Sequence, residues 1–120
     1  MDIETAVKGA LDVRGRIEQN FKSPDALSDL ITKLSAYNAH IGDEVGRLEL
    51  ELAEERTAKH YQYTNDGDLS ESAAKTKIDA EQAIKKAEQK NLKIMHSDCK
   101  TIISTIQSRI KVLQEERRYG

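Results

Sequence analysis

The sequence LSDLITKLSAYNAHIGDEVGRLELEL, residues 27–52, repeats apolar side chains at alternating spacings of four and three. This spacing is the heptad repeat of a helix that packs along one seam against a partner helix. It therefore predicts a long helix over residues 24–63. The expected seam positions are Leu27, Ile31, Leu34, Asn38, Ile41, Val45, Leu48 and Leu52.

Turn and capping residues bound this helix on both sides. Ser23 suits the N-cap and Pro24 suits the first helical position, where its missing N–H has no intrahelical partner. TNDGD, residues 64–68, is rich in residues that favour turns. A short turn between two long helices makes them antiparallel neighbours. The predicted fold is therefore all-α: a long, coiled-coil-like antiparallel helical hairpin.

Two further helices complete the predicted domain of residues 1–120. A short N-terminal helix over residues 1–22 is expected at the open end of the hairpin, with an apolar stripe of Ile3, Val7, Ala10, Ile17 and Phe21. The third helix should span residues 69–118 and be capped by Asp68 or Ser70. Its expected inner face is alanine-rich first and isoleucine-rich later: Ala73, Ala74, Ile78, Ala80, Ile84, Ala87, Asn91, Met95, Cys99, Ile102, Ile106, Ile110 and Leu113.

Composition argues against several classes of protein. Only 4% of residues are aromatic, so we expect a thin seam between helices rather than a broad core with a substrate cleft. A single cysteine, Cys99, forms no intrachain disulfide and suits a reducing cytoplasm. The start of the chain lacks the pattern of a signal peptide. No apolar run reaches the length of a membrane span, so no membrane association is expected.

The motifs of common catalytic sites are also missing. The sequence has no HExxH, CxxC, Walker loop or GxGxxG, so we expect no cofactor and no enzymatic activity. His96 and Cys99 are one helical turn apart and could share a metal, but two ligands do not complete a site. The favoured interpretation of Cys99 is a small core residue.

Two asparagines are candidates for fixing the register of the hairpin. Residues equidistant from the turn at 64–68 should face each other, and this pairs Asn38 with Asn91. A buried polar pair in a seam can specify register at some expense of stability. The alternative is that one or both side chains lie at the edge of the seam.

Gly42 and Gly46 stand on successive turns of a helix in which each disfavours helix formation by about 1 kcal/mol relative to alanine. Their strip could receive the third helix, receive a second copy of the protein, or mark a bend. Leu50 adds apolar surface outside the main seam. We favour an oligomer interface of Gly42, Gly46 and Leu50, with hairpins pairing into a multi-helix bundle.

The predicted tip of the hairpin carries His60, Tyr61 and Tyr63. Tyrosine is enriched in protein interfaces, so these side chains are candidates for binding a partner protein. The alternative is that they cover the last layer of the seam.

Charge is unevenly distributed along the chain. Residues 1–64 carry 8 Lys and Arg against 12 Asp and Glu, a net −4, whereas residues 84–118 carry 9 against 4, a net +5. A stripe of lysines on the third helix could follow a phosphate backbone. A solvated helix face is the more common meaning of such a stripe, and no aromatic residue interleaves it for base stacking. The candidate phosphate-binding residues are Lys86, Lys90, Lys93, Lys100 and Lys111.

The order of features resembles small helical-hairpin proteins encoded by bacteriophages. The resemblance covers residues 24–118 and rests on the Ser-Ala-Tyr run at 35–37, the short polar turn, SESAAKTKIDAE at 70–81 and RIKVLQEERR at 109–118. It implies a phage accessory protein in the host cytoplasm, encoded among recombination and replication genes, and it brings no catalytic residues.

Three functions follow from these observations. The leading hypothesis is a non-enzymatic interaction protein that forms a homo-oligomer and binds another protein. The alternatives are a DNA-binding accessory protein that uses the lysine stripe, and a strut in a virion or its assembly.

Overall fold

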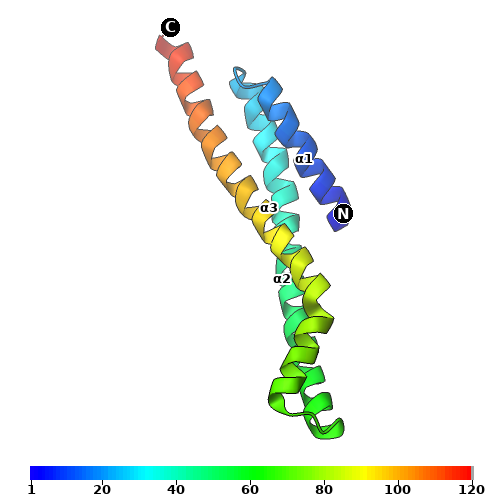
Figure 1. The fold of residues 1–120 in the computed structure, drawn as a ribbon. Helices are drawn as coiled ribbons and strands as arrows, with labels where there is room; N and C mark the ends of the chain where they lie inside the picture. Colours follow the sequence, from blue (N-terminus) through cyan, green and yellow to red (C-terminus); the bar gives the residue numbers. More distant parts are fainter. Residues whose placement is uncertain (120) are drawn as a thin grey trace. The chain divides into compact units, whose positions relative to one another are not determined.

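The protein is all-helical in the computed structural model, which describes residues 1–119 (Figure 1). Helix α1 spans Ile3–Gln19, α2 spans Pro24–Tyr61 and α3 spans Glu71–Tyr119. A π-helical turn, η1 (Gln62–Asp66), follows α2 directly. The described residues contain no strand, and the predicted all-α class with a helical hairpin is confirmed.

Where the sequence predicts one domain, the described chain divides into two compact units. Unit 1 comprises Met1–Asp43 and the chain from Ile94 onward, and unit 2 comprises Glu44–Lys93. Unit 1 therefore holds α1, the first part of α2 and the last part of α3. Unit 2 holds the remainder of α2 and α3 with the turn that joins them.

A polar side chain caps the start of each helix. Asp2, Ser23 and Ser70 each accept a hydrogen bond from the backbone N–H three residues further on, at 2.8, 3.3 and 3.1 Å. These bonds satisfy N–H groups that have no partner within the helix. The predicted cap at Ser23 is confirmed, and Ser70 rather than Asp68 caps α3.

The turn of the hairpin lies later in the chain than predicted. Helix α2 passes into η1, and the N–H of Gly67 donates to the carbonyl of Gln62 at 3.0 Å. Asp68 then adopts the left-handed conformation with φ 54°, which aspartate tolerates better than most residues. Helix α3 begins at Glu71, two residues after the predicted start. Each α2 residue consequently faces a later α3 residue than the sequence predicts.

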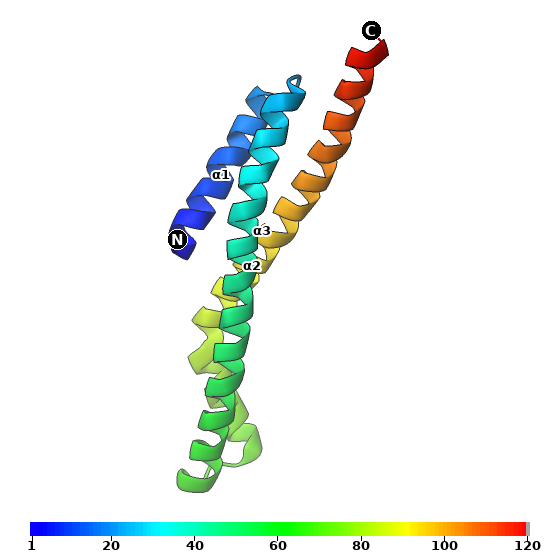
Figure 2. The same ribbon diagram turned by 180° about the vertical axis from the view of Figure 1, so that it is seen from behind.

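Unit 2 is a two-helix hairpin with a narrow seam between α2 and α3 (Figure 2). Leu48 and Leu52 are buried on α2, as predicted. The predicted inner face of the third helix is confirmed in this unit only at Ala74 and Ile78, which are buried. The other predicted positions, Ala73, Ala80, Ile84, Ala87 and Asn91, are exposed. Gln82 and Gln89, which the prediction did not include, are buried as well.

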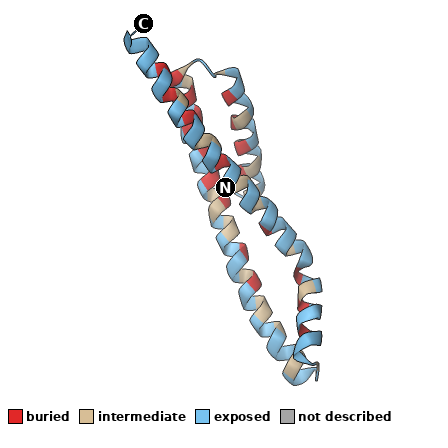
Figure 3. Ribbon diagram, turned by 60° about the vertical axis from the view of Figure 1, so that its left-hand side comes forward, coloured by how far each residue is buried: buried red, intermediate tan, exposed pale blue. Residues whose placement is uncertain are grey.

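Unit 1 packs three helical segments around an apolar core (Figure 3). Helix α1 buries a stripe that differs from the predicted one, since Phe21 is 45% exposed and Val13 is buried. The ring of Tyr37 lies directly over Gly9, where a Cβ would overlap it, so this glycine permits close packing of α1 on α2. The buried apolar residues are Ala6, Ala10, Val13, Ile17, Leu27, Leu30, Ile31, Leu34, Ile41, Cys99, Ile106, Ile110 and Leu113.

Candidate functional site

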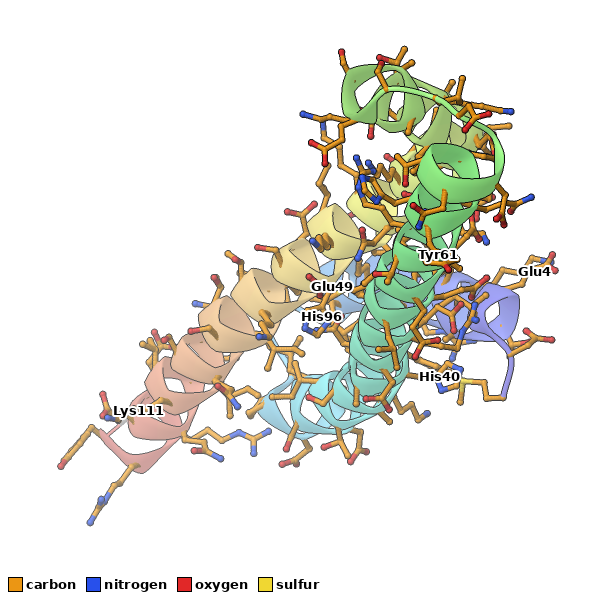
Figure 4. All side chains as sticks on the ribbon, turned by 90° about the horizontal axis from the view of Figure 1, so that it is seen from below. Glu4, His40, Glu49, Tyr61, His96 and Lys111 are labelled. Carbon is orange, nitrogen blue, oxygen red and sulfur yellow. The ribbon has the colours of Figure 1, made fainter. Side chains whose placement is uncertain are left out.

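Asn38, Gly42 and His96 form a polar cluster in unit 1, and His96 lies between α3 and α2 in Figure 4. The His96 Nδ1 is 3.1 Å from the Asn38 carbonyl oxygen and 3.0 Å from Asn38 Oδ1. The Asn38 amide donates in return to the His96 carbonyl at 3.1 Å. A Cβ on Gly42 would lie 2.7 Å from His96 Cε1. Gly42 therefore makes the space that the imidazole ring occupies.

This cluster corrects two predictions. The partner of Asn38 is His96 rather than Asn91, which is exposed. The later position of the turn accounts for the difference. Gly42 packs against His96 on α3 of its own chain, which is one of the three predicted arrangements. The favoured arrangement was an oligomer interface. Gly46 has no neighbouring atom within 4 Å of a Cβ and is exposed.

Side-chain amides continue to bridge α2 and α3 in unit 2. Gln82 donates to the Leu52 carbonyl at 2.9 Å, and Gln89 donates to the Val45 carbonyl at 3.4 Å. The α3 donors are seven residues apart, and so are the α2 acceptors, which matches the heptad period. Gln82 is 1% exposed, and its Oε1 has no hydrogen-bond partner. The apolar pattern of the sequence does not reveal these positions, although the heptad spacing that starts at Ile78 continues through both glutamines.

The three candidate residues at the tip, His60, Tyr61 and Tyr63, differ in their contacts and exposure. The Tyr63 hydroxyl contacts both Glu81 carboxylate oxygens, at 2.6 and 2.8 Å, and Lys77 Nζ lies 4.3 Å from the centre of its ring. Its hydrogen bond to Glu81 raises the pKa of Tyr63 above its usual value. Tyr61 is 64% exposed, and His60 is also exposed. Tyr63 thus belongs to the hairpin, while His60 and Tyr61 remain accessible to a partner.

A network of ion pairs crosses the hairpin of unit 2. Lys85 Nζ lies 2.8 Å from a Glu51 oxygen and 3.1 Å from a Glu55 oxygen. Lys59 Nζ forms ion pairs with a Glu55 oxygen at 3.3 Å and with a Glu81 oxygen at 2.5 Å. Hydrogen bonds to Lys85 are the main cause that lowers the pKa of Glu51 and of Glu55. The network thus stabilises the ionised carboxylates.

The five candidate phosphate-binding lysines are all exposed, as a solvated stripe requires. Lys86 Nζ lies 3.4 Å from Asp79 Oδ1, and this oxygen also accepts a 2.8 Å hydrogen bond from Arg56. Within residues 1–119, no ion pair involves Lys90, Lys93, Lys100 or Lys111. These four ammonium groups are free to meet an anionic partner.

An uncharged stripe runs along the outside of α2 in unit 2. Gly46, Leu50, Ala53 and Thr57 follow one another at spacings of four, three and four, and all are exposed. We name these residues the α2 outer stripe. Leu50, which is 61% exposed, is its only large apolar side chain. Glu49 and Glu54 lie one turn from stripe residues on either side.

A second uncharged stripe runs along the outside of α3 in the same unit. Ala80, Ile84, Ala87 and Asn91 have the same spacings of four, three and four, and all are exposed. We name them the α3 outer stripe. Ile84 is 78% exposed, a large exposure for an isoleucine within a helix. These four residues were predicted to lie on the inner face of the third helix. They do form one continuous stripe, but the stripe is exposed.

The described residues show no metal centre. Across residues 1–119, no group of three His, Cys, Asp or Glu side chains is placed to hold an ion. Cys99 is buried, as predicted, and burial raises the pKa of its thiol. The described helices also include none that is long and apolar enough to cross a membrane.

Comparison with known proteins identifies no relative of this chain. No protein-family model matches the chain, no curated protein matches it, and no solved structure matches it.

Proposed function

We propose that the protein is a non-enzymatic helical assembly protein that associates with itself and presents its accessible surfaces to another protein. The observation that carries this proposal is the pair of outer stripes in unit 2. A helix that needs only one partner normally exposes polar and charged residues on the side opposite its seam. Both helices of the hairpin instead expose an uncharged stripe with a large apolar residue at its centre.

The resemblance to phage-encoded hairpin proteins gives the proposal its setting. We place the protein among the accessory proteins of phage recombination and replication, in the host cytoplasm. In that setting the partner protein would meet His60 and Tyr61 at the tip, the most accessible aromatic surface of unit 2.

Solution mass tests self-association. Light scattering should find the parent protein at a multiple of its 13.5 kDa chain mass. Leu50→Arg/Ala53→Arg adds two long charged side chains to the α2 outer stripe and should reduce the mass to that of a monomer. Gln107→Arg/Gln114→Arg, at exposed positions elsewhere on α3, is the matched control and should leave the mass unchanged. Circular dichroism verifies that each variant remains helical. A monomeric parent would overturn the proposal.

DNA binding is the second candidate function, and the four lysines without an ion pair favour it. Retention of a DNA oligonucleotide should weaken steeply with salt if these groups displace counterions from phosphates. Lys90→Glu/Lys93→Glu/Lys100→Glu should then abolish retention. Equal retention by parent and triple variant would exclude this function for the stripe.

A further inference from the structure

We infer that α1 is a hinged cover, which swings away from the core of unit 1 at residues 20–23 while α2 and α3 stay helical and paired. Such a movement takes place within one chain and is separate from the proposed self-association. Helix α1 lies alongside the first part of α2 and is joined to it by a short segment at one end (Figure 1 and Figure 2).

Helix α1 is held on the core by packing rather than by polar bonds. Its buried side chains are Ala6, Ala10, Val13 and Ile17, and alanine has little apolar surface to bury. Both ion pairs of α1 lie within the helix itself. In the part of the chain that the structure describes, no residue of α1 forms a hydrogen bond or an ion pair with α2 or α3. Packing of a few small side chains therefore provides most of the attachment.

Charge and shape add little to this attachment. Asp2, which caps α1, lies within electrostatic reach of His40 on α2, but the two groups form no ion pair. A groove of about 250 Å³ separates the C-terminal part of α1 from α3, and it is lined by Arg14 on one side and by Thr101 and Thr105 on the other. The two helices are therefore not closely packed at this point.

The contact between α2 and α3 in unit 1 does include polar bonds. Asn38 and His96 make three contacts of 3.0–3.1 Å across this contact, and none of them involves α1. Helix α2 also begins without help from α1, because Ser23 caps it and Pro24 occupies its first position. We therefore expect α2 and α3 to remain paired when α1 moves away.

Residues 20–23 have the structure of a pivot. Asn20 closes α1 through its N–H, which donates to the Ile17 carbonyl at 3.1 Å. Arg109 on α3 holds the next residue, because its Nε donates to the Phe21 carbonyl at 3.2 Å and its guanidinium lies 4.8 Å from the centre of the Phe21 ring. The segment is thus fixed to α3, and α1 must open from its N-terminal end.

Helix α1 should lose its helical structure when it leaves the core. It has only 17 residues, and isolated helices of about this length are marginal in water. Gly9 and Gly15 weaken it further, since glycine is a poor helix former. Opening is thus a local unfolding event of the kind that native proteins undergo in their least stable elements.

The single cysteine reports on this opening. Cys99 on α3 is 0% exposed, and Arg14 of α1 lies close enough for its charge to act on the thiol. Helix α1 is therefore part of what covers Cys99. A thiol reagent can modify Cys99 only when the cover opens or the whole protein unfolds.

The urea dependence of this modification distinguishes the two routes. The parent protein is treated with excess N-ethylmaleimide at several urea concentrations below the unfolding transition, and mass spectrometry follows the modification of Cys99. Opening of α1 exposes little surface, so the rate should change little with urea. Modification through complete unfolding should accelerate steeply, because the effect of urea scales with the surface exposed.

Two neighbouring substitutions test which element is the cover. Ala10→Glu places a carboxylate at a position that is 0% exposed, and it should raise the modification rate by about tenfold or more, because burying an unpaired charge disfavours the closed state. Circular dichroism should show a loss of helix no larger than α1, which has 17 residues against 38 in α2 and 49 in α3. Leu11→Glu adds the same charge at a position that is 54% exposed, and it should react as the parent does.

Three results would overturn the inference. A parent rate that rises with urea as steeply as complete unfolding would show that α1 leaves only with the rest of the fold. Modification of Ala10→Glu at the parent's rate would show that α1 does not cover Cys99. Loss of nearly all helix in Ala10→Glu would show that α2 and α3 depend on α1 to stay folded.

Discussion

A single glycine shows how one residue decides local packing. Gly42 lies one helical turn from Asn38 and leaves room for the His96 ring to reach the Asn38 carbonyl and side-chain oxygens. Gly46, one turn later, faces open space. The two glycines should therefore have opposite effects on stability, although they lie on neighbouring turns of the same helix.

Alanine substitutions should reveal this difference. Gly42→Ala should lower the free energy of unfolding by about 1 kcal/mol, because the new Cβ displaces His96 from its hydrogen bonds. Gly46→Ala should raise it by about 0.5–1 kcal/mol through higher helix propensity. Chemical denaturation monitored by circular dichroism measures both. A stabilising Gly42→Ala would show that His96 moves aside without loss.

Asn38 and Asn91 should also differ in how much each contributes to stability. Asn38→Ala removes the side-chain oxygen and the amide that meet His96, and we expect a loss of about 1–2 kcal/mol in unfolding free energy. Asn91→Ala changes an exposed position and should be neutral or slightly stabilising, since alanine is the better helix former. The same denaturation measurement applies. Equal effects at both positions would contradict the placement of Asn38 in the seam.

At the scale of elements, the ion-pair network should make the α2–α3 hairpin sensitive to acid. Glu51, Glu55 and Glu81 have folded-state pKa values below the ordinary value of 4.5. A lowered folded-state pKa contributes stability above the unfolded pKa, and this stability is lost as pH falls through the folded value. The melting temperature should therefore drop as pH is lowered below about 4.5.

Lys85→Gln is the control for this acid sensitivity. It removes the main cause of the lowered pKa of both Glu51 and Glu55, so the melting temperature should vary less with acid pH than in the parent. Parallel profiles for parent and variant would show that the network does not link protonation to stability.

The buried Gln82 makes the seam of unit 2 less stable than an apolar seam would be. Its Oε1 has no partner, and an unsatisfied buried polar group costs about 1–3 kcal/mol. Gln82→Leu should therefore raise the free energy of unfolding by about 1 kcal/mol despite losing the bond to the Leu52 carbonyl. Chemical denaturation measures the change. A destabilised variant would indicate that a water satisfies the free oxygen.

At the scale of the whole molecule, the charge beside the α2 outer stripe should control self-association. Glu49→Lys/Glu54→Lys reverses the two carboxylates that border this stripe, and it should change the mass found by light scattering. Raising salt should reduce the difference, because exposed charges are screened. Equal masses for parent and variant at every salt concentration would show that these residues lie outside the contact.

The sequence predicted α2 better than α3, and the reason lies in particular residues. The α2 seam is nearly all apolar, so its heptad spacing is visible directly, and Leu27, Leu34, Ile41 and Leu48 are buried as expected. On α3 the seam passes through Gln82, Lys85 and Gln89, while alanines and Ile84 occupy another face. Between residues 80 and 91 apolarity therefore pointed to the exposed side, whereas other predicted positions on α3 are buried as expected. Of the candidate site residues, Asn38 was paired with the wrong residue, and Gly42 packs against α3, which was one of its three predicted arrangements.

Local chemistry in the sequence alone determined the helices, the cap at Ser23, the polar turn and the seam of α2, because these depend on residues within a turn or two of each other. Only the tertiary structure decided which face of α3 is buried and which residue meets Asn38. Those outcomes depend on register, which the geometry from η1 to Asp68 sets for every residue that follows. A shift of a few residues in such a turn moves each α3 side chain to a different place around its helix.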